Sequence, residues 1–323
     1  MIDPFGRAIR YLRLSVTDRC DLRCLYCMPE RMQFLPRADL LTLEELERLA
    51  LAFVGRGVTR IRVTGGEPLV RKGVMRLFER LGGAIGKGLE EVTLTTNGSR
   101  LKEHAPGLFA AGVRRVNVSL DTLDAARFAH ITRGGVLADT LDGIAAAKDA
   151  GLTVKINTVA LRGLNEDELA PLLRWSHGNG FDITLIETMP MGEGAETHAR
   201  HHLPLSDVRA RLEGQFQLQP STHRSGGPAR YFDVGETGGR LGLITPLSHN
   251  FCDSCNRVRL TCTGQLYQCL GQNDRADLRA VLRGGDDTDL AAAIDAAIAV
   301  KPRGHDFIVG KPAVPRVMAA TGG

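Results

Sequence analysis

Three of the seven cysteines lie close together in the sequence Cys20-Asp-Leu-Arg-Cys24-Leu-Tyr-Cys27. Thiols spaced this closely, in a reducing compartment, are typical of a metal centre. A structural zinc site requires four ligands, and no fourth cysteine or histidine lies nearby in the sequence. A [4Fe–4S] cluster normally takes four thiolates, so three of them leave one iron free for an external ligand. The run therefore predicts an iron–sulfur cluster with an open iron position.

A second group of cysteines lies near the end of the chain, at Cys252-Asp-Ser-Cys255 and Cys269. These three form a CX2CX13C arrangement. Cys262 lies between them, and all four together form a CX2CX6CX6C arrangement that suits a four-cysteine zinc site. Spacing alone therefore does not decide whether this group binds zinc.

The elements that must position these cysteines are predicted by hydrophobic periodicity. Short runs rich in β-branched residues predict six strands, at Leu12 to Val16, Arg60 to Thr64, Val92 to Thr96, Val116 to Leu120, Val154 to Val159 and Ile183 to Glu187. Helical periodicity lies between most of them. Thr42-Leu-Glu-Glu45 is a capping box, and a helix from Leu137 to Ala150 ends at Gly151. This alternation predicts an α/β fold with a parallel sheet, as a partial barrel or a doubly wound sheet.

In both folds, ligands bind at the carboxyl ends of the strands. Candidate motifs lie there. Thr17-Asp-Arg-Cys20, Gly65-Gly-Glu-Pro68 and Asn97-Gly98 follow the first three predicted strands, Ser119-Leu-Asp-Thr122 ends the fourth, Lys155 lies in the fifth and Met189 follows the sixth. After about Ser206 the alternation fades into a Gly- and Pro-punctuated region that holds four of the seven cysteines. We therefore predict one domain at 1–205 and a second at 206–323.

Composition narrows the class of protein further. Lys plus Arg is 41 and Asp plus Glu is 37, and this net charge of +4 is too small to predict a nucleic-acid or membrane surface. No apolar run approaches the roughly 18 residues of a membrane span, and the first residues, MIDPFGRAIR, lack a signal-peptide pattern. We expect a cytoplasmic protein.

The first cysteine run is the signature of the radical S-adenosylmethionine superfamily, which the chain resembles. In that superfamily the free iron is chelated by S-adenosylmethionine, which is split into methionine and a 5'-deoxyadenosyl radical. The resemblance implies a partial (β/α)6, TIM-like barrel, in agreement with the six predicted strands. Gly65-Gly-Glu-Pro68 resembles the motif for the methionine amino group, with the glycines close to the ligand and Glu67 compensating the cationic amine.

Both cysteine groups together, with their flanking sequence, resemble the GTP 3',8-cyclase family of molybdenum cofactor biosynthesis. The matching stretches span nearly the whole chain: Leu12 to Cys20, Arg62 to Pro68, Asn117 to Thr122, Glu187 to Pro190, Phe251 to Leu260 and Arg316 to Gly323. The resemblance implies that Cys252, Cys255 and Cys269 hold a second [4Fe–4S] cluster, whose open iron binds the guanine of GTP. Cys262 is then a buried bystander, and the C-terminal extension covers the open side of the barrel.

The resemblance also assigns site residues. Cys20, Cys24 and Cys27 hold the first [4Fe–4S] cluster, and S-adenosylmethionine is contacted by Tyr26, Gly66, Glu67, Ser119 and Met189. GTP is contacted by Arg13, Arg62, Thr95, Lys155, Arg257 and Arg259. We expect the four arginines at strand ends or beside Cys255, where charge-assisted bonds to a triphosphate are strong. Gly322 and Gly323 form a tail that enters the active site and is needed for cyclisation.

Two positions depart from the family pattern. Thr184 stands where an arginine that assists the substrate phosphates is expected, so phosphate binding is rearranged or the alignment is shifted there. Asp21 replaces an asparagine, which a loop tolerates.

The implied reaction converts GTP to 3',8-cyclo-7,8-dihydro-GTP, the precursor of the molybdenum cofactor pterin. The implied partners are an electron donor and the cyclic pyranopterin monophosphate synthase, which takes the product. The sequence leaves undecided whether the protein forms a homodimer. Two alternatives remain at this stage. One is a peptide-modifying radical enzyme with an auxiliary cluster, and the other is a zinc-stabilised binding protein without catalytic activity.

Overall fold

Six parallel strands form the wall of the barrel in the computed structural model, which describes residues 1–192, 195–309, 311 and 313–322. The strands are β1 (Tyr11–Ser15), β2 (Arg60–Thr64), β3 (Glu91–Thr96), β4 (Arg115–Ser119), β5 (Thr153–Ala160) and β6 (Asp182–Glu187). All six predicted strands are confirmed, and no predicted end differs from the observed one by more than one residue.

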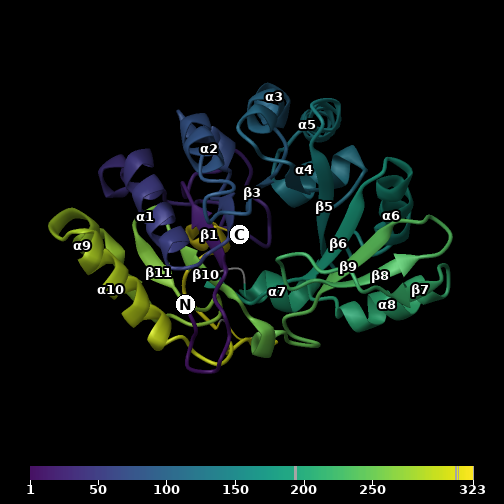
Figure 1. Cartoon of the computed structure of the whole chain (residues 1–323). Coiled ribbons are helices and arrows are strands. Elements are labelled where there is room, and N and C mark those ends of the chain that lie inside the picture. Colours follow the sequence, from purple (N-terminus) through teal and green to yellow (C-terminus); the bar gives the residue numbers. More distant parts are fainter. Residues whose placement is uncertain (193–194, 310, 312, 323) are drawn as a thin grey trace.

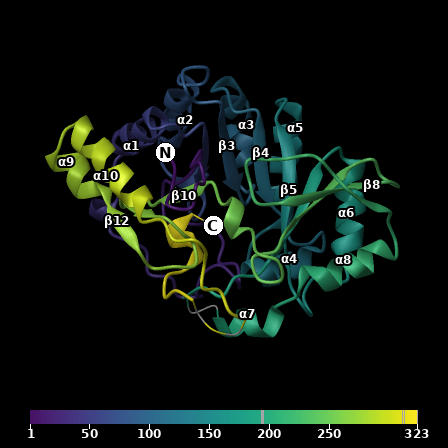
Figure 2. The same ribbon diagram turned by 60° about the horizontal axis from the view of Figure 1, so that its bottom comes forward.

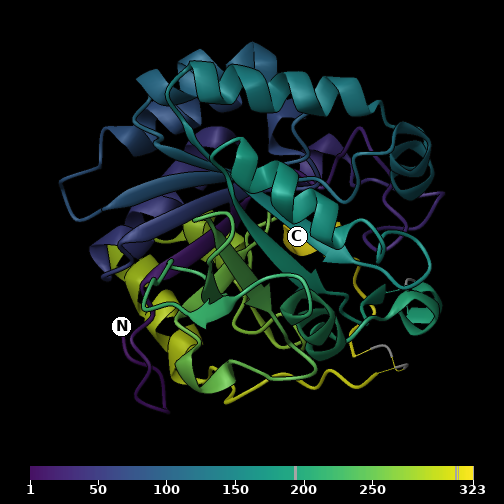
Figure 3. The ribbon, with the colours of Figure 1, turned by 90° about the vertical axis from the view of Figure 1, so that its right-hand side faces the viewer.

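Helices connect the strands and cover the outer side of the wall (Figures 1 and 3). They are α1 (Leu43–Gly55), α2 (Val74–Gly82), α3 (Leu101–Ala110), α4 (Ala125–Thr132), α5 (Leu137–Asp149) and α6 (Leu169–Gly178). The predicted capping box opens α1: the Glu45 backbone N–H donates to Thr42 Oγ1 at 3.1 Å, and the Thr42 N–H donates to Glu45 Oε2 at 2.8 Å. The predicted second helix is α5, which ends one residue earlier than expected.

The C-terminal region extends both edges of the same sheet. Strands β9 (Arg240–Ile244) and β10 (Arg257–Leu260) lie parallel to β6 and β1, respectively. Short antiparallel strands continue the two edges: β8 (Arg230–Val234), β7 (Leu218–Pro220), β11 (Gln265–Tyr267) and β12 (Arg275–Asp277). Among the described residues the result is one 12-stranded sheet. The partial barrel with a C-terminal extension is therefore the observed fold.

In the described part of the chain four further helices follow β6: α7 (Ala195–His201), α8 (Leu205–Glu213), α9 (Leu278–Gly284) and α10 (Asp287–Ala299). Figures 1 and 2 show α9 and α10 beside α1, at the edge that β10 to β12 continue. The predicted boundary at 205/206 falls at the start of α8, and no change of sheet marks it. The division into two domains stays a prediction.

Alternation along the strands places apolar and charged side chains on opposite faces. In β1, Leu12 and Leu14 are fully buried in the apolar core, and Arg13 between them faces the inner side. The same alternation places Arg62, Lys155 and Arg259 on the inner face of β2, β5 and β10. A closed barrel fills its interior with branched apolar side chains, so a cationic inner face indicates a binding site for an anion.

The positions of Arg13 and Arg62 correct the expectation that these two arginines lie at strand ends, whereas Arg257 and Arg259 lie beside Cys255 as expected. Arg13, Arg62 and Arg259 are each the third residue of their strand and therefore lie inside the barrel wall. Arg257 begins β10, two residues after Cys255. No helix among the described residues is long and apolar enough to span a membrane.

Candidate active site

Cys20, Cys24 and Cys27 lie together in the loop that follows β1. Burial, followed by Cys27, Asp121 and Cys20, raises the pKa of Cys24 well above its usual value. Burial also raises the pKa of Cys20 to about 12 and that of Cys27 to about 11. The Leu22 backbone N–H donates to Cys20 Sγ at 3.4 Å. Three neighbouring thiols with raised pKa values ionise when a bound cation compensates their charge, and the Leu22 N–H donates to one of the sulfurs. Both features fit a cluster held by three thiolates.

The Gly65-Gly-Glu-Pro68 segment packs against the backbone that leads into this loop. The Gly66 N–H donates to the Thr17 carbonyl at 2.8 Å, and the Glu67 N–H donates to the Arg19 carbonyl at 2.8 Å. A Cβ atom at Gly66 would collide with the Arg19 carbonyl. We expected the glycines to allow close approach to a ligand, whereas the contact they demonstrably allow is with the cysteine loop itself.

Glu67 is fully buried, and its carboxylate accepts hydrogen bonds from other residues of the chain. It accepts hydrogen bonds from the Leu69 N–H at 2.9 Å, the Asn97 N–H at 2.7 Å and the Thr96 hydroxyl at 2.9 Å. Burial raises the pKa of Glu67 to about 7, although these donors oppose the rise. Glu67 therefore joins the motif after β2 to the end of β3, and its role toward the amine of a cofactor stays a prediction.

Replacing Glu67 with glutamine is expected to lower the free energy of unfolding by about 1–3 kcal/mol. The new amide nitrogen is a donor, so a buried backbone N–H of Leu69 or Asn97 loses its acceptor. Chemical denaturation measures the change. The matched control is Glu90→Gln, because the Glu90 side chain is 57% exposed and its loss should cost no more than about 0.5 kcal/mol. Equal stability of both variants would contradict the structural role of Glu67.

Asp121 joins the cysteine loop to the end of β4. It accepts a hydrogen bond from the Tyr26 hydroxyl at 2.7 Å and another from the Val159 N–H at 2.8 Å. Burial raises the pKa of Asp121 to about 6, and burial together with Asp121 raises the pKa of Tyr26 well above its usual value. Tyr26 is thereby fixed above the carboxyl ends of β4 and β5.

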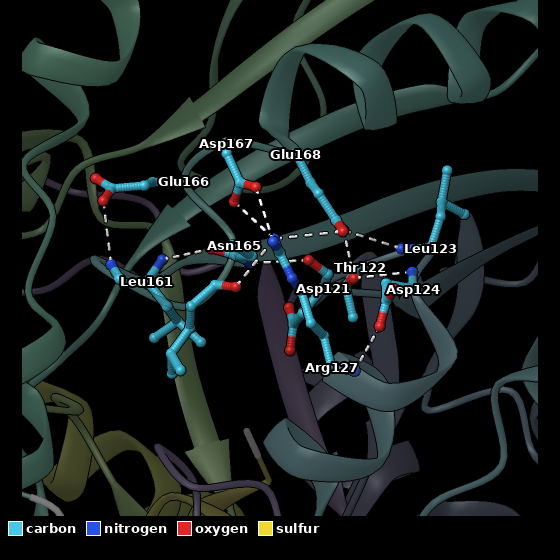
Figure 4. A network of polar contacts seen from close by, with 12 residues as sticks. Asp121, Thr122, Leu123, Asp124, Arg127, Leu161, Asn165, Glu166, Asp167 and Glu168 are labelled. Carbon is cyan, nitrogen blue, oxygen red and sulfur yellow. Dashed lines mark hydrogen bonds and ion pairs between the residues drawn. The ribbon is translucent and has the colours of Figure 1, made fainter.

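The residues after Asp121 are held by a polar network with the segment before α6 (Figure 4). Asn165 Nδ2 donates to the Asp121 carbonyl at 2.8 Å, and the Thr122 hydroxyl donates to Glu168. Arg127 bridges to Asp167 with Nη1–Oδ1 at 2.6 Å. This network fixes the edge at which Ser119, the last residue of β4, is half-buried. Met189, also half-buried, follows β6 at the same edge of the sheet.

A row of buried cations crosses the inner face below this edge. Arg259, Arg13 and Arg62 lie directly opposite one another in β10, β1 and β2. Among the described residues, no Asp or Glu forms an ion pair with Arg62, Lys155, Arg257 or Arg259. Burying Arg62, Lys155, Arg257 and Arg259 without a carboxylate partner is costly, and a polyanionic ligand would remove this cost.

The pKa values of the row follow from the same arrangement. Burial, then the charge of Arg62, lowers the pKa of Lys155 to about 7. Burial and Arg257 lower the pKa of Arg259 to about 10, and burial with Arg259 and Arg62 lowers that of Arg13 well below its usual value. Burial first, and neighbouring cations second, therefore disfavour the protonated forms of Lys155, Arg259 and Arg13.

Several buried polar atoms on the inner face lack a hydrogen-bond partner in the described part of the chain. They are Thr95 Oγ1, Asn117 Oδ1, Asn157 Oδ1, Thr184 Oγ1, Arg257 Nε and Arg259 Nη1. Buried polar atoms are normally paired, so these indicate that a polar ligand completes the site. Thr184 lies opposite Gly242 of β9, and no arginine takes the place at which the family pattern expects one.

The second cysteine group lies at the other end of the cation row. Cys252 is in a 3-10 turn (Cys252–Ser254), Cys255 follows it, and Cys269 lies two residues after β11. Burial, with smaller effects of Cys255 and Cys252, raises the pKa of Cys269. Burial would also raise the pKa of Cys255, but Arg257 and Lys301 together lower it. Cys252 and Cys255 therefore lie close enough to Cys269 to act on its thiol.

Cys262 is separate from this group. It is 1% exposed, and its carbonyl accepts a hydrogen bond from the Leu41 N–H at 2.8 Å. Burial, then Asp18, raises its pKa to about 12, and its remaining neighbours include Arg71 and Ser15. Among the described residues, no set of three or more Cys, His, Asp or Glu side chains converges closely enough to hold a single metal ion.

The end of the chain returns to the inner side of the barrel (Figure 2). Arg13 Nη2 donates to the Gly322 carbonyl at 2.8 Å, and a Cβ atom at Gly322 would collide with Thr64. Ala319 is fully buried. Burial raises the pKa of Cys27, and a hydrogen bond from the Ala319 backbone to Cys27 opposes this rise. The tail therefore touches both the first cysteine group and a predicted GTP residue. Gly323 lies outside the described residues.

A partial barrel of parallel strands with a CX3CX2C loop directly after its first strand defines a radical SAM protein. The sequence model of the Radical SAM superfamily matches residues 14–176, and that of Molybdenum Cofactor Synthesis C matches residues 181–307. Over its full length the chain is 63% identical to the GTP 3',8-cyclase of Rhizobium meliloti (strain 1021), across 94% of that protein. It is 60% identical to the GTP 3',8-cyclase of Erythrobacter litoralis, across 98% of that protein. The chain belongs to the GTP 3',8-cyclase family.

Solved structures agree on the fold alone. Streptococcus suis SuiB bound to S-adenosylmethionine superposes with a TM-score of 0.61 at 14% sequence identity. The match covers 84% of this chain and 63% of that chain.

Membership of the GTP 3',8-cyclase family decides against the two alternatives considered from the sequence, a peptide-modifying radical enzyme and a zinc-stabilised binding protein.

Three residues at the site were not predicted from the sequence. Asp121 lies inside the Ser119 to Thr122 motif, so its position among polar residues at a strand end was an available signal. Arg7, which donates to the Cys252 carbonyl at 2.7 Å, and Lys301, which lies beside Cys255, are distant in sequence from the cysteines. No local pattern marks either of them.

Proposed function

We propose that this protein converts GTP to 3',8-cyclo-7,8-dihydro-GTP, the first step of molybdenum cofactor biosynthesis. Family membership supports the reaction, and one observation carries its application to this chain. The buried cations Lys155, Arg62, Arg13 and Arg259 lead across the inner face to a second group of three cysteines. A ligand with a polyanionic end and a metal-binding base suits that arrangement.

In this proposal Cys20, Cys24 and Cys27 hold a [4Fe–4S] cluster, and Tyr26, Gly66, Glu67, Ser119 and Met189 hold S-adenosylmethionine beside it. When bound, these groups supply the 5'-deoxyadenosyl radical that abstracts hydrogen from carbon 3' of the GTP ribose. The hydrogen bond from Tyr26 to Asp121 keeps the tyrosine ring in one orientation next to Cys24 and Cys27.

The triphosphate binds along Arg13, Arg62, Lys155, Arg257 and Arg259, with Thr95 as a further polar contact. Ion pairs to a buried polyanion are strong, and they restore the protonated state of Lys155 that burial disfavours. Cys252, Cys255 and Cys269 would hold a second [4Fe–4S] cluster, whose open iron would offer the guanine a ligand position. A guanine held there would keep its carbon 8 within reach of carbon 3' of the ribose.

Gly322 and Gly323 act in the cyclisation step as the tail that reaches this interior. The hydrogen bond from Arg13 to the Gly322 carbonyl supports the role, because Arg13 also contacts the phosphates in this proposal. Ala319 and Thr321, both fully buried, keep the end of the chain in place and help to exclude water.

The proposed setting is cytoplasmic. An electron donor reduces the first cluster, and the product passes to the cyclic pyranopterin monophosphate synthase.

The function is tested by anaerobic reconstitution with iron and sulfide, reduction, and incubation with S-adenosylmethionine and GTP. Chromatography with mass spectrometry should detect 5'-deoxyadenosine and a cyclised GTP in equal amounts. A reconstituted, reduced protein that yields neither compound would reject the proposed function.

A further inference from the structure

A buried lysine lies against the second cysteine group. Lys301 follows α10 and is 2% exposed. Its Nζ donates to the Gln268 carbonyl at 2.6 Å and lies 3.7 Å from Cys255 Sγ. Because Gln268 directly precedes Cys269, a single ammonium group connects the two chain segments that carry these cysteines.

The surroundings of Lys301 lack a compensating carboxylate. Among the described residues, Nζ forms no ion pair with an Asp or Glu. Arg257, Arg7 and Arg259, which also act on or with Cys255, are cations as well. A buried ammonium group among cations is costly, so the negative charge must come from what the cysteines bind.

We propose that Lys301 is a positioning residue for the second cluster, which it holds through Cys255 and Cys269 and whose reduction potential it raises by its charge. The inference rests on the proposed second [4Fe–4S] cluster. Three thiolates give a cluster a net negative charge, and one-electron reduction makes that charge larger. A positive charge within hydrogen-bond distance of a ligating sulfur stabilises the reduced form more than the oxidised form.

Four variants separate charge from packing. Lys301→Met and Lys301→Gln remove the charge, and the glutamine keeps a donor for the Gln268 carbonyl. Lys301→Arg keeps the charge. Arg303→Gln is the matched control, because it removes a cation from the same segment. The Arg303 side chain is 74% exposed, and its Nε lies 3.5 Å from Asp253 Oδ1.

Each variant is prepared as the full chain, and again with Cys20, Cys24 and Cys27 replaced by alanine so that only the second cluster remains. Iron per chain and the midpoint potential, followed by electron paramagnetic resonance during a redox titration, are the two measurements. Both are independent of turnover.

We expect Lys301→Met and Lys301→Gln to shift the midpoint potential to a more negative value. At a fixed potential the ratio of reduced to oxidised cluster should fall about tenfold, which for one electron corresponds to about 59 mV. Lys301→Arg and Arg303→Gln should stay near the parent protein. Loss of iron from both uncharged variants, with iron retained in Lys301→Arg, would also support the proposal.

An unchanged potential and iron content in the uncharged variants would overturn the inference and leave the proposed function intact. Equal iron loss in all three Lys301 variants would overturn the role of the charge. If the parent protein without the first cysteine group binds no iron, the second cluster itself is rejected, and this inference is rejected with it.

Discussion

Replacing Cys269 with serine is expected to remove the second cluster, so that iron falls from about eight to about four atoms per chain. Cys269 lies near Cys252 and Cys255, and both of these thiols act on its ionisation. Loss of one of only three ligands leaves too few to hold a cluster. GTP cyclisation should be abolished, because the guanine then has no iron to bind.

Cys262→Ser is the matched control for this change. Cys262 is equally a cysteine of the C-terminal region, but its neighbours are Asp18, Arg71 and Ser15 and not the other thiols. Iron content and product formation should stay at the level of the unmodified chain. Iron analysis of both variants after the same anaerobic reconstitution makes the comparison, and equal iron loss from both would show that the third ligand is wrongly assigned.

Lys155→Met is expected to change GTP binding and stability in opposite directions. A lost charge-assisted contact costs about 1.5–3 kcal/mol, so GTP should bind about tenfold to a hundredfold more weakly. The ligand-free protein should become more stable, by on the order of 1–3 kcal/mol, because a buried ammonium without a carboxylate partner is removed. The Tyr231 hydroxyl, which accepts from Lys155 Nζ at 3.2 Å, keeps Ser225 as a partner.

The stability cost of burying Lys155 depends on pH, and its direction follows from the lowered pKa. Burial, then Arg62, lowers the pKa of Lys155 from 10.5 to about 7, so between these values the unfolded chain binds a proton that the folded chain lacks. Stability therefore rises with pH across this window, and the full penalty is present below about pH 7. In Lys155→Met this part of the rise should disappear.

Calorimetric titration with GTP and denaturation at several pH values measure both effects. Lys148→Met is the control, because Lys148 is an exposed residue of α5 that donates to the Asn179 carbonyl. It should leave GTP affinity and the pH slope unchanged. Two results would contradict this role: lower stability of ligand-free Lys155→Met at neutral pH, or normal GTP binding by the variant. Either would show that Lys155 is not a buried cation of an anion-binding site.

Much of the barrel could be predicted because its strands and helices carry local signals. The run Arg60 to Thr64 combines β-branched residues with alternation, and it coincides with β2. The capping box at Thr42 is likewise a contact between near neighbours in the sequence. The cysteine spacing is local too, and it separated Cys20, Cys24 and Cys27 from the rest.

The remaining features depend on residues that are distant in the sequence. Nothing near Arg259 indicates that it pairs in register with Arg13, since that contact requires β10 to join the edge of β1. The reason for Gly66 was also hidden, because the carbonyl of Arg19 belongs to another loop. Helix α10 opens with its own capping box at Asp286 and Asp289, a local signal that the Gly- and Pro-rich surroundings obscured.

The central claim is that this barrel generates a radical that abstracts hydrogen from carbon 3' of GTP. The most direct test incubates the reduced, reconstituted protein with S-adenosylmethionine and GTP that carries deuterium at carbon 3'. The account predicts deuterium in the 5'-deoxyadenosine, together with a cyclised GTP that has lost it from carbon 3'. Formation of 5'-deoxyadenosine free of deuterium, with the label retained in unchanged GTP, would contradict the account.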